Sequence, residues 1–161
     1  MCINATCLCL RLWPCAYVGT LPRTWSTFTG LHSLALDSNV FSGTYPRAYS
    51  SLSLLTYLNV SSNQLTGTLP STLTHLSSLQ SLGLYANLFT ASMPATFSSL
   101  TNLTLLYIGS PNLSGSLPRQ YSVLAKLASL MLNGAGSAFT GEGCGWGESG
   151  GHACMQRSTM S

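Results

Sequence analysis

Few residues in this chain could take part in acid–base or nucleophilic chemistry. The three carboxylates are Asp37, Glu142 and Glu148, and the last two lie in a glycine-rich segment near the carboxyl terminus. No rigid pair of carboxylates is therefore expected for general acid–base work. His32, Ser33 and Asp37 are close enough in sequence to suggest a triad, but they would share one exposed strand face, without a strained nucleophile turn or an oxyanion hole. We predict that the protein is not an enzyme and requires no cofactor.

The cysteines near the carboxyl terminus could serve a structural role. Cys144 and Cys154 flank a glycine-rich loop, and a disulfide between them would close it, as is common in secreted proteins. Together with His152 they could instead hold zinc, but their spacing matches no recurrent zinc motif. The disulfide is the better interpretation, and no metal site is predicted.

Charged residues are scarce along the whole chain. Only 6% of residues are charged, against about 25% in ordinary soluble domains, and serine and threonine take their place as polar surface. The formal net charge of +3 comes from residues spread widely in sequence, with no basic stripe, which argues against a nucleic-acid partner. No apolar run is long enough for a transmembrane helix. The apolar amino terminus lacks a basic region and a cleavage site, so no signal peptide is evident.

A repeat of 24 residues must position all of these groups. Its prolines are Pro22, Pro46, Pro70, Pro94 and Pro118. Apolar residues recur in phase with them, and one period reads LxxLxLxxNxLxGxLPxxLxxL. The LxL alternation predicts a short strand with one buried face, and the asparagine predicts a turn whose side chain pairs buried backbone groups. Glycine permits positive φ, and proline starts the return segment. A single coil buries too little apolar surface to fold alone, so coils must stack.

This pattern, which covers roughly residues 7–141, resembles the leucine-rich repeat. Its 24-residue LxGxLP form is similar to the plant-type class of receptor ectodomains, inhibitor proteins and some protozoan surface antigens. The resemblance implies a leucine-rich repeat solenoid of the right-handed β/α superhelix class. Short parallel strands should line its concave face and 3-10 or irregular segments its convex face, with little regular α-helix. We predict a repeat domain over residues 1–141, with five full coils, a partial sixth and no amino-terminal cap. A Gly-rich, disordered tail should follow over residues 142–161.

Cysteines also fall inside the first predicted coil. Cys7 occupies a core leucine position of the repeat and Cys15 the turn asparagine position. We expect both to be buried free thiols, which behave as small apolar side chains. A bridge from Cys2 to Cys7 or Cys9 is the alternative.

Two later coils depart from the consensus. Pro111 replaces the turn asparagine and Ala91 the glycine. Proline removes an amide donor, and we expect the adjacent Asn112 to stand in partly for the missing side chain. Local irregularity, rather than a broken solenoid, is predicted there.

If the protein binds a ligand, the resemblance places it on the concave sheet, at the positions that flank the buried leucines. These positions are Arg11, Trp13, His32, Ser33, Ala35, Asp37, Tyr57, Asn59, Ser61, Gln80, Ser81, Gly83, Tyr85, Leu105, Tyr107, Gly109, Met131 and Asn133. The candidate ligand-binding residues among them are Tyr57, Tyr85, Tyr107, His32, Asp37 and Asn59. The three tyrosines belong to adjacent coils, about 4.8 Å apart along the stack, and offer rigid contact area with a polar handle. Strand propensity alone would also favour tyrosine there.

Four asparagines begin the N-glycosylation acceptor pattern: Asn4, Asn59, Asn102 and Asn112. Asn102 is the most plausible acceptor because it lies in a loop that enters a strand. A glycan on Asn59 would obstruct the concave face.

Together these features predict an extracellular or membrane-attached cell-surface module that binds a protein or glycan through its concave sheet. The alternative is a structural or coat fragment of a longer surface antigen or receptor, without a ligand of its own. The exposed first coil could also associate with further leucine-rich repeat coils.

Overall fold

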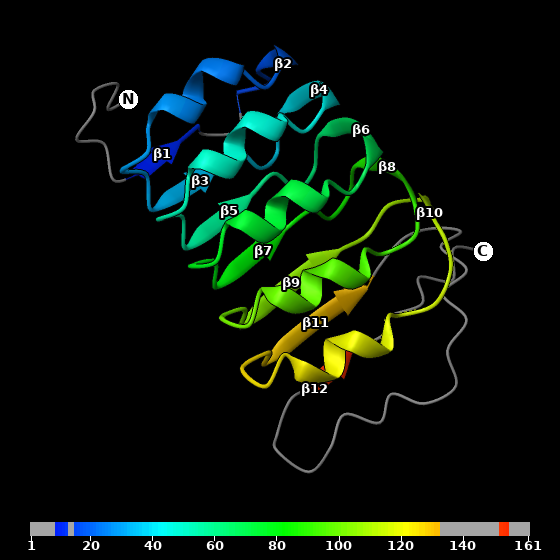
Figure 1. Cartoon of the computed structure of the whole chain (residues 1–161). Helices are drawn as coiled ribbons and strands as arrows, with labels where there is room; N and C mark the ends of the chain where they lie inside the picture. Colours follow the sequence, from blue (N-terminus) through cyan, green and yellow to red (C-terminus); the bar gives the residue numbers. More distant parts are fainter. Residues whose placement is uncertain (1–8, 13–14, 133–151, 155–161) are drawn as a thin grey trace.

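The computed structural model describes residues 9–12, 15–132 and 152–154 of the chain. Successive turns of the polypeptide stack along one axis, and each complete turn contributes a strand to sheet A, a strand to sheet B and a 3-10 helix (Figure 1). Both sheets are parallel. The predicted solenoid of short parallel strands with little α-helix is confirmed.

Sheet A contains the strands predicted from the LxL alternation, β1 to β11, and one further strand, β12, in the segment 142–161 where no strand was predicted. In spatial order its strands are β1 (Cys9–Arg11), β3 (Ser33–Ala35), β5 (Tyr57–Asn59), β7 (Ser81–Gly83), β9 (Leu105–Ile108), β11 (Ser129–Leu132) and β12 (His152–Cys154). Leu34 pairs with Leu58, and Leu58 with Leu82. This register equals the length of the repeat, so equivalent positions of neighbouring coils lie side by side across the sheet.

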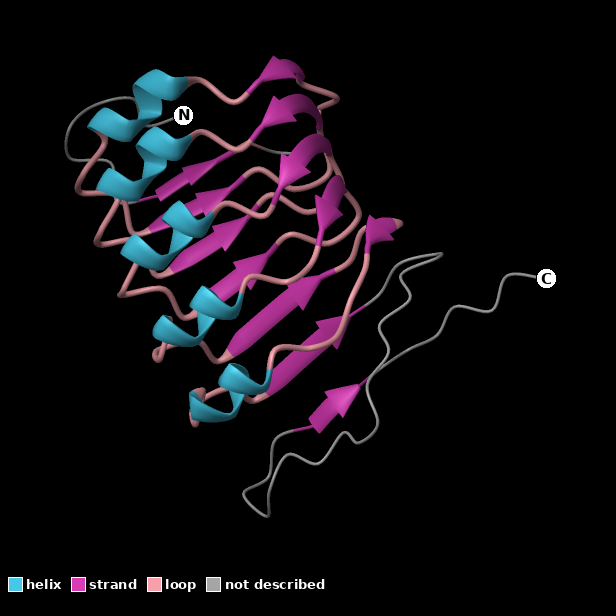
Figure 2. Ribbon diagram, turned by 45° about the vertical axis from the view of Figure 1, so that its right-hand side comes forward, coloured by secondary structure: helices cyan, strands magenta, loops and turns pink. Residues whose placement is uncertain are grey.

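The 3-10 helices form a single row on the side of the solenoid opposite sheet A (Figure 2). They are η1 (Arg23–Thr27), η2 (Arg47–Ser51), η3 (Ser71–His75), η4 (Ala95–Ser99) and η5 (Arg119–Val123). A repeat proline precedes each helix, with φ between −61° and −74°. The carbonyl of that proline accepts the first bond of the turn, as Pro46 O does from Tyr49 N at 3.1 Å. Because the pyrrolidine ring holds φ near −65°, proline begins the return segment in every coil.

Sheet B is a feature that the sequence analysis missed. Its strands, in spatial order, are β10 (Asn112–Leu113), β8 (Leu88–Ala91), β6 (Gln64–Thr68), β4 (Val40–Thr44) and β2 (Val18–Thr20). The signal was present in the LxGxL part of the repeat, where buried residues such as Phe41 and Leu65 precede outward polar ones. Glycine lies within β2, β4 and β6 and weakens strand propensity, which is why this segment of the repeat was not predicted as a strand.

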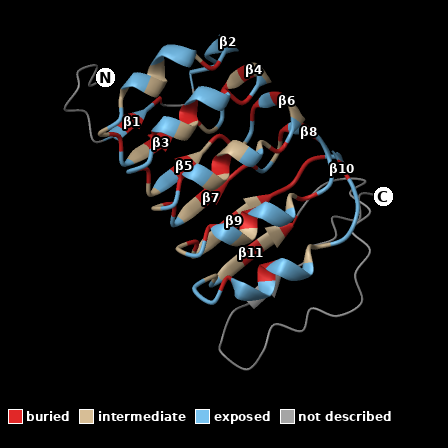
Figure 3. Ribbon diagram, in the orientation of Figure 1, coloured by how far each residue is buried: buried red, intermediate tan, exposed pale blue. Residues whose placement is uncertain are grey.

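A continuous apolar core fills the space between the sheets and the helices (Figure 3). Most of the repeat leucines, among them Leu34, Leu58 and Leu82, have no exposed surface. Each buried aliphatic side chain contributes roughly 1.5–3 kcal/mol, and the stacking of coils supplies this burial. The solenoid therefore depends on neighbours rather than on any single coil.

Three tyrosines replace smaller apolar residues in this core. Tyr49 Oη donates to Pro22 O at 2.9 Å, and Tyr121 Oη donates to Pro94 O at 3.0 Å. Tyr45 packs edge-on against Tyr49, with ring centroids 5.4 Å apart, but its buried hydroxyl has no hydrogen-bond partner. Burial raises the pKa of all three hydroxyls well above the usual value of 10.0.

The repeat asparagines Asn39, Asn63 and Asn87 form a buried ladder in the turns after β3, β5 and β7, as predicted. Asn63 Nδ2 donates to Leu36 O at 2.9 Å and to Val60 O at 3.1 Å, and its Oδ1 accepts from Phe41 N at 2.9 Å. One side chain thus pairs backbone groups of adjacent coils. Asn87 repeats the arrangement one coil further on.

Where Pro111 interrupts this ladder, the expected substitute was wrong. Asn112 is exposed, whereas the buried hydroxyl of Ser110 donates to Asn87 O at 2.7 Å and is 2.8 Å from Phe89 O. Ser110 thus supplies a buried hydrogen bond to the preceding coil beside the missing asparagine, but to other carbonyls than those equivalent to the partners of Asn63. Ala91, at the glycine position, adopts φ 73°, close to Gly43 at 75° and Gly67 at 82°. The backbone shape is therefore kept despite the side chain.

The prediction for Cys15 was also wrong. This residue is exposed, although its amide donates to Asn39 Oδ1 at 3.4 Å. It lies in the first described coil, on the side where no described coil covers it. Cys2, Cys7 and Cys144, together with the disulfide and zinc predictions that involve them, lie outside the described residues.

Candidate binding face

The outer face of sheet A carries the residues predicted to bind a ligand. Side chains on this face come from the positions that alternate with the buried leucines, and the register aligns them in rows across the coils. One row contains Asn59, Gly83 and Tyr107, since Asn59 pairs with Gly83 and Gly83 with Tyr107. Glycine in the middle of this row leaves room for its neighbours.

Asn59 occupies the space above Gly83. A methyl group built on Gly83 would collide with Asn59 Oδ1 and would lie 2.9 Å from Ser61 Oγ. The amide is held in this position because its Oδ1 accepts from Ser61 N at 3.1 Å and its Nδ2 donates to Tyr57 Oη at 3.3 Å. Asn59 thereby fixes the hydroxyl end of Tyr57 on the sheet, and these two predicted residues act as one unit.

A small apolar pocket lies beside this unit. It has a volume of about 140 Å³ and is lined by Ser61, Tyr85, Tyr107 and Met131. The lining residues come from four successive coils, β5 to β11 and the turns that follow. Two predicted tyrosines therefore share a pocket. Ser61 and Met131 were recognised only as outward positions, because sequence spacing does not show which side chains converge.

His32 and Asp37 do not join this pocket. His32 is exposed, and its Nδ1 lies 2.9 Å from the carbonyl oxygen of Gly30. Asp37 is half-buried beyond the end of β3, and its backbone carbonyl accepts from Asn39 Nδ2 at 3.1 Å. Within the described chain no hydrogen bond connects His32, Ser33 and Asp37 as a triad would require. No group of three or more His, Cys, Asp or Glu side chains suited to a metal occurs there either.

The predicted glycosylation sites differ in their surroundings. Asn102 is half-buried; its Nδ2 donates to Ser77 O at 3.0 Å, and its Oδ1 accepts from Lys126 Nζ at 2.7 Å. Asn112 is exposed, Asn59 is held as described above, and Asn4 lies outside the described residues.

Comparison with known proteins agrees with this architecture. A profile of the leucine rich repeat family matches residues 29–89. The ectodomain of the membrane receptor kinase GASSHO1/SCHENGEN3 from Arabidopsis thaliana, in complex with CASPARIAN STRIP INTEGRITY FACTOR 2, superimposes with a TM-score of 0.75 over 78% of this chain, at 32% identity. The chain is a leucine-rich repeat protein of the plant-type class.

Two further solved structures support the same membership. The plant peptide hormone receptor RGFR1 in complex with RGF2 has a TM-score of 0.71 and 34% identity over 74% of this chain. The BIR2 ectodomain from Arabidopsis thaliana has a TM-score of 0.71 and 28% identity over 83% of it. A comparison with curated protein sequences gives no match.

This leucine-rich repeat chain spans only 15% of the GASSHO1/SCHENGEN3 chain and 19% of the RGFR1 chain, but 69% of the BIR2 chain. Its fold is that of receptor ectodomains, in which the repeats form a binding scaffold. Among the described residues, no helix has the length and hydrophobicity needed to cross a bilayer.

Proposed function

We propose that this protein is an extracellular binding module that recognises an extended segment of a protein partner through the outer face of sheet A. An apolar side chain of the partner enters the pocket between Tyr85 and Tyr107. The Tyr57–Asn59 unit supplies hydrogen-bonding groups to the partner's backbone beside it.

The convergence of Ser61, Tyr85, Tyr107 and Met131 is the observation that carries this proposal. Tyrosine and methionine are enriched where proteins bind other proteins, because they provide large contact area at a low entropic cost. A pocket of about 140 Å³ accommodates one side chain rather than a whole small molecule. Parallel strands with a buried core beneath them hold these side chains in place before the partner arrives, which favours affinity.

The relatives support a protein rather than a glycan partner. GASSHO1/SCHENGEN3 and RGFR1 are both described in complex with a peptide or factor, and a binding scaffold of this kind needs no catalytic group. We extend to this chain an extracellular location and a role without catalysis. His32 and Asp37 would contact the end of the partner that lies over β3.

Peptide selection can test the proposal without knowledge of the natural partner. A displayed library of random peptides is selected on the purified chain, and the affinities of the enriched peptides are measured for wild type and for Tyr85→Ala/Tyr107→Ala. We expect enriched peptides to share one large apolar residue, and the double variant to bind them at least about 30-fold more weakly, as expected for loss of hot-spot residues.

Tyr17→Ala is the matched control. Tyr17 and Tyr85 are each 42% exposed, but Tyr17 lies ahead of β2, away from sheet A. Its replacement should change affinity less than about twofold. Equal affinity of the double variant and wild type would refute the proposal, and selection of no peptide at all would favour the coat or spacer role. Binding to an immobilised glycan array, with no peptide enriched from the library, would point to a carbohydrate partner.

We also propose Asn102 and Asn112 as glycan acceptors, since both lie away from the pocket. Mass spectrometry of the protein secreted from a eukaryotic host tests this. A glycan found on Asn59 would contradict the assignment of its amide to the binding face.

A further inference from the structure

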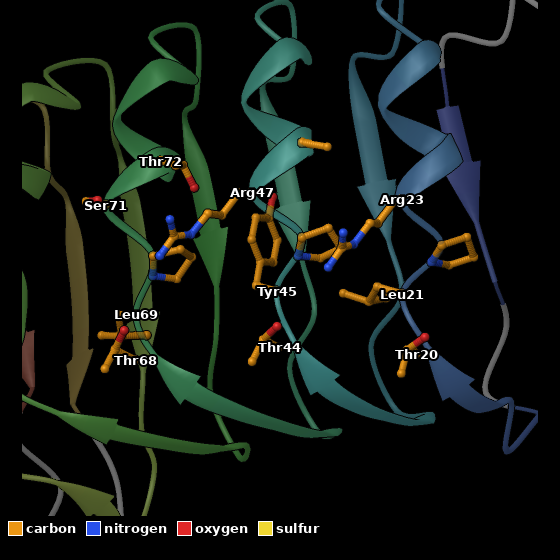
Figure 4. A pocket seen from close by; sticks show the side chains of 14 residues that line it. Thr20, Leu21, Arg23, Thr44, Tyr45, Arg47, Thr68, Leu69, Ser71 and Thr72 are labelled. Atoms are coloured by element: carbon orange, nitrogen blue, oxygen red, sulfur yellow. The ribbon is translucent and has the colours of Figure 1, made fainter.

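A second concavity lies on a different surface, between sheet B and the 3-10 helices. It is a groove of about 700 Å³ that crosses three successive coils. Residues 20–23, 44–48 and 68–72 line it, at the carboxyl ends of β2, β4 and β6 and the first residues of η1, η2 and η3 (Figure 4). None of the residues of the sheet A pocket takes part, so the two surfaces are separate.

Two arginines lie side by side in this groove. Arg23 and Arg47 occupy the same position of the repeat in adjacent coils, both are exposed, and each side chain extends toward the coil that follows it (Figure 4). Asp37 is the one carboxylate side chain among the described residues, and it does not line the groove. Two guanidinium groups therefore face solvent with no acidic side chain in the groove to neutralise them.

Hydroxyl groups form the other edge of the groove. Thr20, Thr44 and Thr68 are exposed and lie in a line across the three coils (Figure 4). The methyl groups of Thr20 and Thr44 lie close to the glycines of the following strands, 3.1 Å from the position of a methyl group built on Gly43 or Gly67. The glycines thus leave room for the threonine methyl groups, and the spacing of the threonines follows the coil spacing of about 4.8 Å.

The groove also has an incomplete set of hydrogen bonds. In the part of the chain that the structure describes, two buried side-chain oxygen atoms lack a partner, Tyr45 Oη and Thr72 Oγ1, and both residues line this groove. Buried polar groups are nearly always paired in folded proteins, so an unpaired one requires an explanation. The unpaired hydroxyl groups therefore lie in the same groove as the two arginines.

We propose that this groove binds an acidic oligosaccharide, whose sulfate or carboxylate groups pair with Arg23 and Arg47 and whose hydroxyls contact the threonine edge. Guanidinium groups bind oxyanions through two parallel hydrogen bonds, which gives both charge and geometry. The regular coil spacing suits a chain with repeating units. This inference stands apart from the proposed function of sheet A.

Other polyanions fit the groove less well. Proteins that bind single-stranded nucleic acid stack bases on exposed aromatic rings, but the one aromatic residue of the groove, Tyr45, is buried. A peptide partner would need an apolar anchor pocket, whereas the exposed rim consists of hydroxyls, arginines and small side chains. Sugar hydroxyls and acidic groups match this rim directly.

Calorimetry with defined probes tests the inference on the purified full chain. The probes are a sulfated heparin-derived hexasaccharide, a hexamer of galacturonic acid and a neutral dextran-derived hexasaccharide. At low salt, one or both acidic probes should bind and the neutral one should not, and binding should weaken as salt screens the charges. Arg23→Gln/Arg47→Gln should lower the affinity at least about tenfold. The sulfated and galacturonate arms identify which acidic group is preferred.

The repeat offers its own matched control, Arg119. It has the same position in η5 but lies outside the groove, so Arg119→Gln should change affinity less than about twofold. Ser71→Arg, which would add a third arginine to the row, should raise affinity, and thermal unfolding confirms that each variant is folded. The inference is overturned if neither acidic probe binds wild type, or if Arg119→Gln lowers the affinity as much as Arg23→Gln/Arg47→Gln does. It is also overturned if single-stranded DNA or an acidic peptide binds more tightly than the acidic oligosaccharides.

Discussion

Replacing Tyr45 with phenylalanine should stabilise the protein, although the same change at Tyr49 should destabilise it. The two rings are in contact, with centroids 5.4 Å apart, but only the Tyr49 hydroxyl has a partner, Pro22 O at 2.9 Å. A buried, unpaired hydroxyl costs about 1–3 kcal/mol. Removing it at Tyr45 should therefore raise the free energy of unfolding by about 1–2 kcal/mol. Removing the Tyr49 hydroxyl deletes one hydrogen bond and leaves a carbonyl unpaired, which should lower it by about 1–2 kcal/mol.

Urea unfolding, followed by circular dichroism, measures the difference, which should be about 2–4 kcal/mol between the two variants, with similar denaturant dependence. Tyr121→Phe provides a replicate, because its hydroxyl donates to Pro94 O at 3.0 Å in the same geometry; it should match Tyr49→Phe. If Tyr45→Phe were as destabilising as Tyr49→Phe and Tyr121→Phe, the Tyr45 hydroxyl would have a hydrogen-bond partner, and its description as an unpaired group lining the groove would be wrong.

Further perturbations test other parts of the structure. The free energy of unfolding should keep its full value below about pH 10 and fall as the pH rises further. Burial raises the pKa of Tyr45, Tyr49 and Tyr121 only in the folded state, so the unfolded chain ionises first. A denaturation midpoint that does not change between neutral pH and pH values above about 10 would contradict this. Ala91→Gly should raise the free energy of unfolding by about 0.5–1 kcal/mol, since φ is 73° there and glycine adopts such angles without strain, although it increases the entropy of the unfolded chain. Urea unfolding measures the change, and a lower free energy of unfolding would contradict this reasoning. Asn63→Ala should cost about 3 kcal/mol or more, because backbone groups of two coils lose their partner; a loss below about 1 kcal/mol in the same assay would show that water replaces the amide.

Much of the fold could be predicted because each period carries the same local instructions. The LxL alternation identified strands β1 to β11 of sheet A, proline identified the start of each return segment, and asparagine identified the turn ladder. Each of these depends on residues within one coil. Sheet B was missed because glycine lies within three of its strands, β2, β4 and β6. The side chain that bonds to the preceding coil beside Pro111 was misassigned to Asn112, because the sequence does not show that Ser110 faces the interior and Asn112 faces solvent.

The geometry of the candidate binding face could be predicted only in part. The outward positions follow from strand alternation, so the sequence placed Tyr57, Tyr85 and Tyr107 on the outer face of sheet A. Which of these tyrosines contact each other or Asn59 was not predicted, because it depends on the space above Gly83 and on the directions of the side chains. Tyr85 and Tyr107 share a pocket, whereas Tyr57 is bonded to Asn59 instead.

The sequence by itself determined the period, the stacking of coils and the residues that face inward, since a repeating apolar pattern can bury its surface in no other way. Only the tertiary structure decided which side chains of neighbouring coils share one pocket or groove. Arg23 and Arg47 are 24 positions apart in the chain yet line one groove, and their charges, which look dispersed in the sequence, are concentrated by the stacking. The physical reason is that the coil turns a separation of one period into a distance of one strand spacing, about 4.8 Å.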